Sequence, residues 1–516
     1  MSSDIGGREA VDESELEADP RRWAGLAVLA GSLLMVVMDM TILNVALPSM
    51  AADLRPSSTE LLWIVDVYAL VVAGLLVTTS SLGDRWGRRS MLIAGFVVFG
   101  VASAAVVFAD TSGQVIAVRV LLGVGGAMIM PSTLSLIRHL FPDPRERATA
   151  LGVWGAMAAV GAALGPIVGG ALLEAFSWHS AFLVNVPVMV VAIVAAVFLL
   201  PNSRSARPPR LDAVGTITSI AGMVALMYSI KEFGKHGIST TAVLTLVAAV
   251  VLITWFIWHC LRREDPLLEV RLFRGRTFTA GTVTALTTSI GLAAMMLLGA
   301  QWLQLVQGYS PLIAGVALLP AAGFGLVGSL LAPPLAARIG VRSVLALGLL
   351  SSAGGFFLLF AAPAPLTYLW VAAALSAVGL GMGALAVASA AIMNGAPPEK
   401  SGSAAAVDES SFELGSALGV AILGSVAAAA YRSELPAADL AAAGLPTEAV
   451  AAARESLAGA LEVAALAGPA GDPLAVLARV SFTDSFTAFG LAGGVLLTIS
   501  AVGVWLLTPR DARAVH

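Results

Sequence analysis

Four carboxylic acids and one guanidinium lie inside long apolar stretches of this sequence, and these are the side chains that could do chemistry. The acids are Asp39, Asp66, Glu409 and Glu413, and the base is Arg119. A charge near the centre of a bilayer costs several kcal/mol, so charged residues in such stretches are candidates for function. A buried carboxyl group can hold either a proton or a cation, and competition between the two would couple proton movement to the movement of a cationic molecule.

Asp39, Arg119, Glu409 and Glu413 are the candidates for proton coupling. Arg119 is the only basic residue that we expect deep inside a helix. We expect it to pair with Asp39 and to adjust the proton affinity of that acid; a purely structural ion pair is the alternative. Glu409 and Glu413 have the i, i+4 spacing that puts both on one helix face, and structural hydrogen bonding is their alternative role. Asp408 points away from Glu413, and we expect it nearer the inner surface.

Trp63, Asp66, Gln301, Gln304 and again Glu413 are the candidates for substrate binding. The spacing of Trp63 and Asp66 puts an aromatic ring beside an acid on one helix face, which suits a lipophilic cation. Hydration of Asp66 at the outer rim of the membrane is the alternative. Gln301 and Gln304 also share a face and could line a wet cavity, or they could form hydrogen bonds between helices.

The composition requires lipid as the solvent. Apolar residues make up 58% of the chain and charged residues 12%, with a mean hydropathy of +0.89, whereas soluble domains carry about 25% charged residues. The single cysteine excludes a disulfide framework and a cysteine metal site, and the five histidines have no ligand spacing. The sequence offers no nucleophile–base set either. We therefore expect no enzyme, no cofactor, no metal and no nucleic-acid partner.

Fourteen apolar segments are long enough to cross a bilayer, whose core of about 30 Å needs roughly 20 helical residues. The predicted spans are 24–48, 60–82, 91–109, 113–138, 148–174, 181–200, 213–232, 240–260, 277–306, 312–335, 341–361, 366–396, 402–431 and 485–507. With the N-terminus in the cytoplasm, most of the 29 basic residues fall in cytoplasmic stretches, as the positive-inside rule requires. The outer stretches hold few, among them Lys231. Both termini are thus expected in the cytoplasm.

This count divides the chain into five parts. They are a disordered cytoplasmic tail (1–20), a six-helix half (21–200), a linker with two extra membrane helices (201–276), a second six-helix half (277–507) and a second cytoplasmic tail (508–516). The second half includes a long outer loop, 432–484. Pro446-Thr447 and Asp472-Pro473 have the pattern of helix starts, so the loop is expected to form a small cap of short helices, with gating of the substrate as the alternative.

A charged loop follows the second span and has a degenerate copy later in the chain. Residues 82–89 read LGDRWGRR, in which Asp84 can pair with arginine and Gly87 allows a tight reversal between Arg85 and Arg88. Residues 335–342 read LAARIGVR, with Ala337 in the place of the acid. Such an internal echo is typical of transporters built from two related halves.

Further motifs carry a resemblance to one family. Residues 39–48 read DMTILNVALP, 119–127 read RVLLGVGGA and 161–170 read GAALGPIVGG. Together with the charged loop they resemble the major facilitator superfamily, in its branch of fourteen-helix drug:proton antiporters. The runs 63–68 (WIVDVY), 130–137 (MPSTLSLI) and 408–415 (DESSFELG) are most similar to the QacA, SmvA and LfrA type of multidrug and antibiotic exporters. The tenth span lacks the acid that some relatives carry for doubly charged drugs, so the resemblance implies monocationic substrates.

The glycine-rich run of the fifth span has a physical role of its own. Gly161, Gly165, Gly169 and Gly170 allow close packing, and Pro166 removes a backbone hydrogen bond and kinks the helix. Close contact with another helix on the outer side could seal the inward-facing state; ordinary helix packing is the alternative.

These inferences predict an all-α major facilitator fold with fourteen transmembrane helices in a bacterial cytoplasmic membrane. The predicted function is proton-coupled antiport that exports lipophilic, monocationic drugs or antibiotics. A dedicated exporter of one self-made metabolite, or a lipid or glycolipid flippase on the same fold, is the alternative. The expected partners are a small-molecule substrate, protons and the bilayer, and we expect the chain to work as a monomer.

Overall fold

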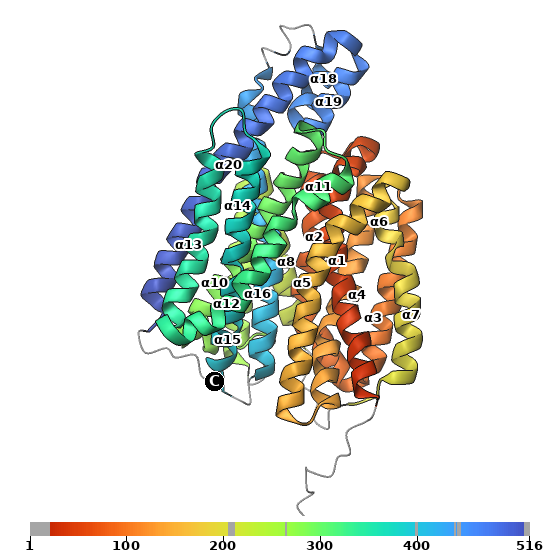
Figure 1. Ribbon diagram of the computed structural model, residues 1–516, viewed down its shortest axis with the longest axis vertical. Coiled ribbons are helices and arrows are strands. Elements are labelled where there is room, and N and C mark those ends of the chain that lie inside the picture. The colour runs from red at the N-terminus through yellow and green to blue at the C-terminus, as the bar shows by residue number, and fades with distance from the viewer. Residues whose placement is uncertain are drawn as a thin grey trace, which may run out of the picture.

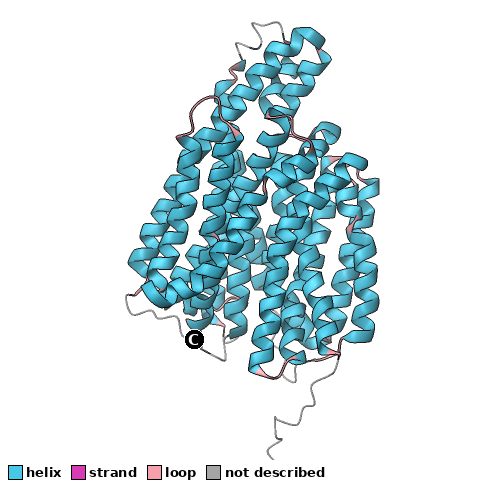
Figure 2. Ribbon diagram, in the orientation of Figure 1, coloured by secondary structure: helices cyan, strands magenta, loops and turns pink. Residues whose placement is uncertain are grey.

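A computed structural model describes residues 21–204, 212–263, 266–397, 401–437, 440 and 445–509 of the chain. Every regular element among these residues is a helix (Figure 2). The predicted tail 1–20 lies outside the described residues, and so does the tail 508–516 apart from its first two residues.

All fourteen predicted spans are helices long and apolar enough to cross a membrane. A first bundle consists of α1 (Arg22–Leu54), α2 (Ser58–Trp86), α3 (Arg88–Ala105), α4 (Ser112–Leu140), α5 (Pro144–Ala175), α6 (Ser180–Leu183) and α7 (Asn185–Leu199). The linker forms α8 (Ala213–His236) and α9 (Thr240–Arg262). A second bundle consists of α10 (Arg276–Gln301), α11 (Pro311–Ala317), α12 (Leu319–Ile339), α13 (Val341–Phe360), α14 (Tyr368–Gly381), α15 (Gly383–Asn394), α16 (Ser401–Glu434) and α20 (Asp472–Leu507).

The long segment 432–484 forms short helices, as predicted. Its helices α18 (Thr447–Glu455) and α19 (Leu457–Leu466) stand above the bundles at one end of the molecule, here called the cap end (Figure 1). Helix α18 begins at Thr447 and α20 at Asp472, as the two proline pairs predicted. Helix α1 begins and α20 ends at the opposite end, here called the base end.

Local sequence explains where several helices begin. At the cap end, α2 and α4 both start with a capping box, in which Ser57 and Glu60, or Thr111 and Gln114, satisfy each other's free backbone N–H groups. At the base end, Gly87 separates α2 from α3 in a conformation with φ of 109°, which favours glycine.

The apolar residues fall into two cores and a lipid-facing surface. One core consists mainly of residues of the first bundle, and the other consists mainly of residues of the second bundle and the cap. A small third cluster joins α2, α8 and α16. Large apolar side chains also cover the outside, for example Phe198 (73% exposed) and Ile499 (66% exposed). Exposed apolar surface on this scale is stable only against lipid.

Candidate transport site

A cavity of about 440 Å³ lies between the two bundles. Its walls come from α1, α2, α4, α5, α10, α12, α15 and α16, and most of the lining side chains are apolar. The charged residues in its wall are four acids and one base, namely Asp66, Asp408, Glu409, Glu413 and Arg119. The cavity therefore combines apolar space with an excess of acidic groups, which suits a lipophilic molecule with positive charge.

Asp39 and Arg119 form the predicted ion pair inside the first bundle. Arg119 Nη1 lies 2.9 Å from Asp39 Oδ2, and both side chains are almost fully buried. Arg119 Nε donates a hydrogen bond to the Ile64 carbonyl oxygen at 3.1 Å, and its guanidinium lies over the Tyr68 ring, 4.5 Å from the ring centre. Arg119 reaches the cavity wall, whereas Asp39 lies behind it and is not among the lining residues.

Asn185 completes this pair, and sequence reasoning missed it. Its Nδ2 donates hydrogen bonds to Asp39 Oδ1 at 2.7 Å and to Ser103 Oγ at 3.2 Å. Both carboxylate oxygens of Asp39 are therefore hydrogen-bonded, one by Arg119 and one by Asn185. Asn185 is a fully buried amide at the start of α7, and its place in an apolar span was the only signal in the sequence.

Glu413 has the opposite surroundings. Its side chain is fully buried at the cavity wall, and neither carboxyl oxygen has a hydrogen-bond partner among the described residues. It lies close enough to Glu409 and Arg119 to interact electrostatically with both. An ionised carboxylate without a direct partner is unstable in such a place, so Glu413 is suited to take up a proton or a cation.

Glu409 and Asp408 also belong to the cavity wall. Asp408, which we ranked below the other acids, thus also lines the cavity, and a hydrogen bond from Ser389 occupies its carboxyl group. The face of α16 that lines the cavity is broad, because it includes residues adjacent in sequence, such as Phe412 and Glu413, as well as residues one turn apart.

The acid–aromatic pair on α2 is already occupied by a cation of the protein itself. Lys231 Nζ lies 2.8 Å from Asp66 Oδ2 and 3.8 Å from the centre of the Trp63 ring. Two expectations are thereby corrected: Lys231 does not lie in an outer stretch, and Arg119 is not the only basic residue buried in a helix. Lys231 falls near the end of the predicted span 213–232, and because α8 continues to His236, this residue lies more than one turn before the end of the helix. Asp66 is 1% exposed, which also excludes hydration at the membrane rim in this conformation.

Gln301 and Gln304 do not reach the cavity. Gln304 Nε2 donates a hydrogen bond to the Val45 carbonyl oxygen of α1 at 3.1 Å, and Gln301 lines a small pocket at the cap end beside Leu47. The chain forms a π-helical turn at Trp302–Val306, which changes the face of Gln304 relative to that of Gln301 at the end of α10. Gln304 therefore has the interhelical hydrogen bond that was the alternative to a wet cavity.

The charged loop after α2 and its copy share a backbone shape but differ in charge. Asp84 pairs with Arg88 at 3.0 Å, the backbone reverses at Gly87, and Arg85 follows Asp84 at the end of α2. A side chain at Gly87 would collide with Asn202. In the copy, Gly340 has a φ of 88° and again ends one helix and starts the next.

The glycines of α5 face two different neighbours. Added Cβ atoms at Gly161, Gly165 and Gly169 would meet Leu34, Thr41 and Ile42 of α1, so these three glycines pack helices within the first bundle. Gly170 touches Leu312 of α11, and Pro166 touches Gly315 of the same helix. Of the glycines and the proline in the predicted motif, Pro166 and Gly170 thus contact the other bundle near the cap end.

The cap adds further contacts across the two bundles. Glu455 of α18 accepts hydrogen bonds from the Ser58 backbone N–H at 2.7 Å and from Lys235 Nζ at 3.2 Å. Glu462 of α19 pairs with Arg55 at the end of α1. Burial alone would raise the pKa of the Glu455 carboxyl group, but the hydrogen bonds from Ser58 and the Lys235 charge together hold it below its ordinary value. The cap therefore closes the cap end with ionised, paired groups.

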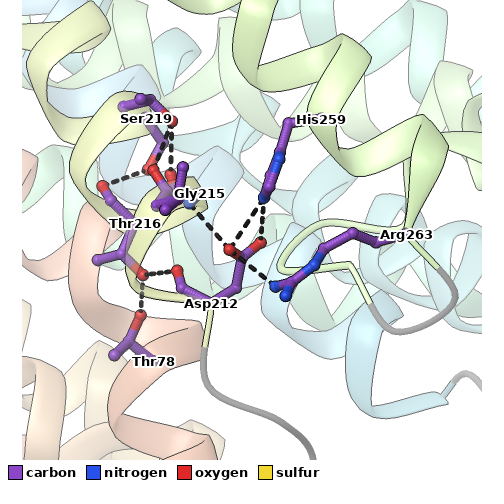
Figure 3. A network of polar contacts seen from close by, with 9 residues as sticks. Thr78, Asp212, Gly215, Thr216, Ser219, His259 and Arg263 are labelled. Atoms are coloured by element: carbon purple, nitrogen blue, oxygen red, sulfur yellow. Dashed lines mark hydrogen bonds and ion pairs between the residues drawn. The ribbon is translucent and has the colours of Figure 1, made fainter.

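A polar network at the base end fixes the linker helices. Asp212 accepts hydrogen bonds from the Gly215 backbone N–H at 3.0 Å and contacts His259 at 3.0 Å and Arg263 at 2.9 Å (Figure 3). These partners outweigh the effect of burial, which alone would raise the pKa of Asp212, and they lower that pKa. Thr78 and Thr216 share a hydrogen bond of 2.6 Å, which ties α8 to α2.

Known proteins resemble this chain along most of its length. The Major Facilitator Superfamily model matches residues 29–420. The chain is 39% identical over 490 residues to the multidrug efflux pump LfrA of Mycolicibacterium smegmatis, covering 94% of this chain and 96% of that protein. It is 37% identical over 503 residues to the methyl viologen resistance protein SmvA of Salmonella typhimurium, covering 96% of this chain and 99% of that protein.

Solved structures support the same fold. A bacterial homologue of the human lysosomal transporter Spinster, solved in an inward-facing conformation, matches with a TM-score of 0.64 at 18% identity and covers 95% of this chain and 97% of that one. The match of the family model, the extent of similarity to both relatives and the fourteen apolar helices agree with one another. The chain is a multi-pass membrane protein that belongs to the major facilitator superfamily, a family of carriers and not of enzymes.

Proposed function

We propose that this protein exports lipophilic drugs or antibiotics across the bacterial cytoplasmic membrane in exchange for protons, and that it prefers monocationic compounds. The observation that carries the proposal is the apolar cavity with Glu413 in its wall, fully buried and without a hydrogen-bond partner among the described residues. The names of the relatives support drug efflux, since one is a multidrug efflux pump and another confers resistance to methyl viologen.

Proton coupling would use the same acids. When Glu413 takes up a proton, its attraction for a cation ends, so proton and substrate exclude each other at one group. One charge that crosses 100 mV releases about 2.3 kcal/mol, and each pH unit adds about 1.4 kcal/mol. A 1:1 exchange of a proton for a monocation moves no net charge, so one proton per cycle would sustain a substrate gradient of about tenfold per pH unit. The membrane potential would add to the driving force only for a neutral substrate. Arg119 would adjust the proton affinity of Asp39 in the first bundle.

We place the base end in the cytoplasm, because the positive-inside rule favours the end where Arg22, Arg88 and Arg276 begin their helices. In this orientation, the Pro166 and Gly170 contacts and the cap close the side that faces away from the cytoplasm. The cavity would then receive its substrate from the cytoplasm. One chain supplies every wall of the cavity, and for this reason we expect a monomer to be active.

The test is uptake by proteoliposomes that contain the purified protein under an imposed pH gradient. Substrates would be a lipophilic monocation, a dication and a neutral compound of similar size, with protein-free vesicles as the control. We expect the monocation to be concentrated only when the gradient is present, and to exceed the dication. Transport that is indifferent to the pH gradient would contradict antiport. Movement of fluorescent lipid without movement of any of the three compounds would favour a flippase.

A further inference from the structure

Lys231 is a buried cation beside the cavity that the proposed exchange of proton and substrate does not use. It lies on α8, a linker helix that packs along α2 of the first bundle and α16 of the second. Met227 of α8 is fully buried against Ala69 and Ala417 from those two helices. The Lys231 side chain extends from this seam to Asp66, and both side chains are buried.

The surroundings of the Lys231 ammonium are those of a cation-binding site. A carboxylate lies on one side, 2.8 Å away, and the face of the Trp63 ring lies on another, 3.8 Å from the nitrogen. A carboxylate beside an aromatic face is the combination that binds organic ammonium ions. Asp66 is also part of the cavity wall, so the site lies beside the space in which a substrate would sit.

We propose that Trp63 and Asp66 form a cation subsite of the transport cavity, that Lys231 occupies this subsite as an internal competitor, and that a cationic substrate enters it by displacing the Lys231 ammonium. The proposal rests on the transport function proposed above. A neutral substrate has no charge to offer Asp66 and leaves the Lys231 pair in place. The linker helix would then help to select substrates by charge.

The anchoring of α8 makes such a displacement possible without loss of the fold. Thr216 holds the base end of α8 against Thr78 of α2, and Asp212 holds it against α9 through His259. Ser229 Oγ bonds the Ala242 carbonyl oxygen of α9 at 2.9 Å. The helix therefore keeps several attachments when the lysine side chain swings away from Asp66.

The test measures binding to the purified full-length protein by titration calorimetry, with tetraphenylphosphonium as the cation and triphenylphosphine oxide as a neutral probe of related shape. Lys231→Met removes the competing charge and keeps the length of the side chain. We expect it to raise the affinity for the cation by about tenfold and to raise the ratio of cation to neutral affinity. Lys231→Arg keeps a competing charge and should stay near the wild-type ratio. Asp66→Asn/Lys231→Met removes the subsite and should lose the gain.

A second measurement keeps the test independent of how the variants fold. In the wild-type protein, saturation with tetraphenylphosphonium should increase the labelling of Lys231 by an amine-reactive reagent, read by mass spectrometry, whereas triphenylphosphine oxide should not. Unchanged labelling, or a folded Lys231→Met variant with the wild-type ratio, would overturn the subsite and leave Lys231 as an anchor of α8. Absence of binding of both probes to the wild-type protein would instead contradict the proposed function itself.

Discussion

Each bundle brings a deeply buried acid close to the space between the bundles, Asp39 in the first and Glu413 in the second, and the surroundings of these two acids differ. Asp39 of the first bundle has both oxygens hydrogen-bonded, by Arg119 and Asn185. Glu413 of the second bundle has no hydrogen-bond partner among the described residues, and it lines the cavity, as Asp39 does not. Asp39 thus belongs to a hydrogen-bonded network, whereas Glu413 is available to bind a proton or a cation.

The charged loop after α2 and its copy after α12 also differ in how far their charges are paired. Both turn at a glycine with positive φ, Gly87 in one and Gly340 in the other. Only the first has an acid, Asp84, which pairs with Arg88, whereas Ala337 stands in the copy and Arg342 lies over the Trp505 ring instead. The bundles thus share backbone geometry, while the first holds more of the paired charge.

The largest effect is expected from Asp39→Asn, which removes the acid from the hydrogen-bonded network of the first bundle. The change leaves the Arg119 charge buried without its acid, which costs about 3–5 kcal/mol of stability, and it removes a group that can take up a proton. We expect a folded but less stable protein that no longer concentrates substrate under a pH gradient. Vesicle uptake and thermal unfolding would measure the two effects.

Asp39→Asn/Arg119→Gln is the control, because it removes both charges. We expect it to regain part of the stability but no transport. If the single variant still concentrated substrate against a gradient, Asp39 would not be a coupling acid.

A smaller and more selective effect is expected from Glu413→Gln. No hydrogen bond among the described residues is lost, so the free energy of unfolding should change by less than about 1 kcal/mol. Export of a monocationic dye should weaken, while export of a neutral lipophilic dye should be spared, because the apolar cavity remains. Efflux of both dyes from cells that carry each variant would measure this. Equal loss for the two dyes would give Glu413 a general role in proton relay.

Closure at the cap end can be tested through the glycines of α5. Gly170→Leu should impair transport more than Gly165→Leu or Gly169→Leu, because only Gly170 of these three touches α11 of the other bundle. All three should lose activity through separation of packed helices. Gly152→Leu is a matched control on the same helix, since a Cβ there would meet nothing within 4 Å. Wild-type transport by Gly170→Leu would reduce the contact to ordinary packing.

The smallest effect is expected from Glu455→Gln in the cap, which should cost about 1 kcal/mol or less. Because the folded-state pKa of Glu455 is lowered, its contribution is fully present above the ordinary pKa of a glutamate, about 4.3, and is lost as the pH falls through the lowered folded-state pKa. Proteolysis of the cap at neutral and acid pH should show the wild type approaching the variant only in acid. Glu448→Gln, at an exposed position of α18, is the control and should not change cleavage.

Hydropathy and spacing predicted much of this structure, and failed where a contact depended on a distant helix. The fourteen spans and the Asp39–Arg119 pair were predicted because length, apolar composition and isolated opposite charges are visible in one dimension. Lys231 was assigned to an outer stretch because a charged residue near the end of an apolar segment is usually interpreted as a loop residue. Its long side chain reaches a carboxylate on α2, which no local pattern reports.

The remaining errors have similar causes. Gln301 and Gln304 were placed by regular helical spacing, which the π-helical turn at Trp302–Val306 does not follow. Asn185 gave no signal beyond being an amide in an apolar segment, and its importance comes from Asp39 on another helix. Asp408 was left out of the predicted site because it points away from Glu413 on a regular helix, yet the cavity reaches both residues.

Helix α20 runs from the cap to the base end of the second bundle and is longer than a membrane span. Its 36 residues make a rod about 54 Å long, against a bilayer core of about 30 Å. The N-terminal end of α20 follows α19, whose Glu462 pairs with Arg55 at the end of α1. Rocking the second bundle by roughly 10° would sweep the tip of such a rod through about 9 Å, given that length. A displacement of this size would separate Glu462 from Arg55, so this contact of the cap with α1 would open and close with the second bundle.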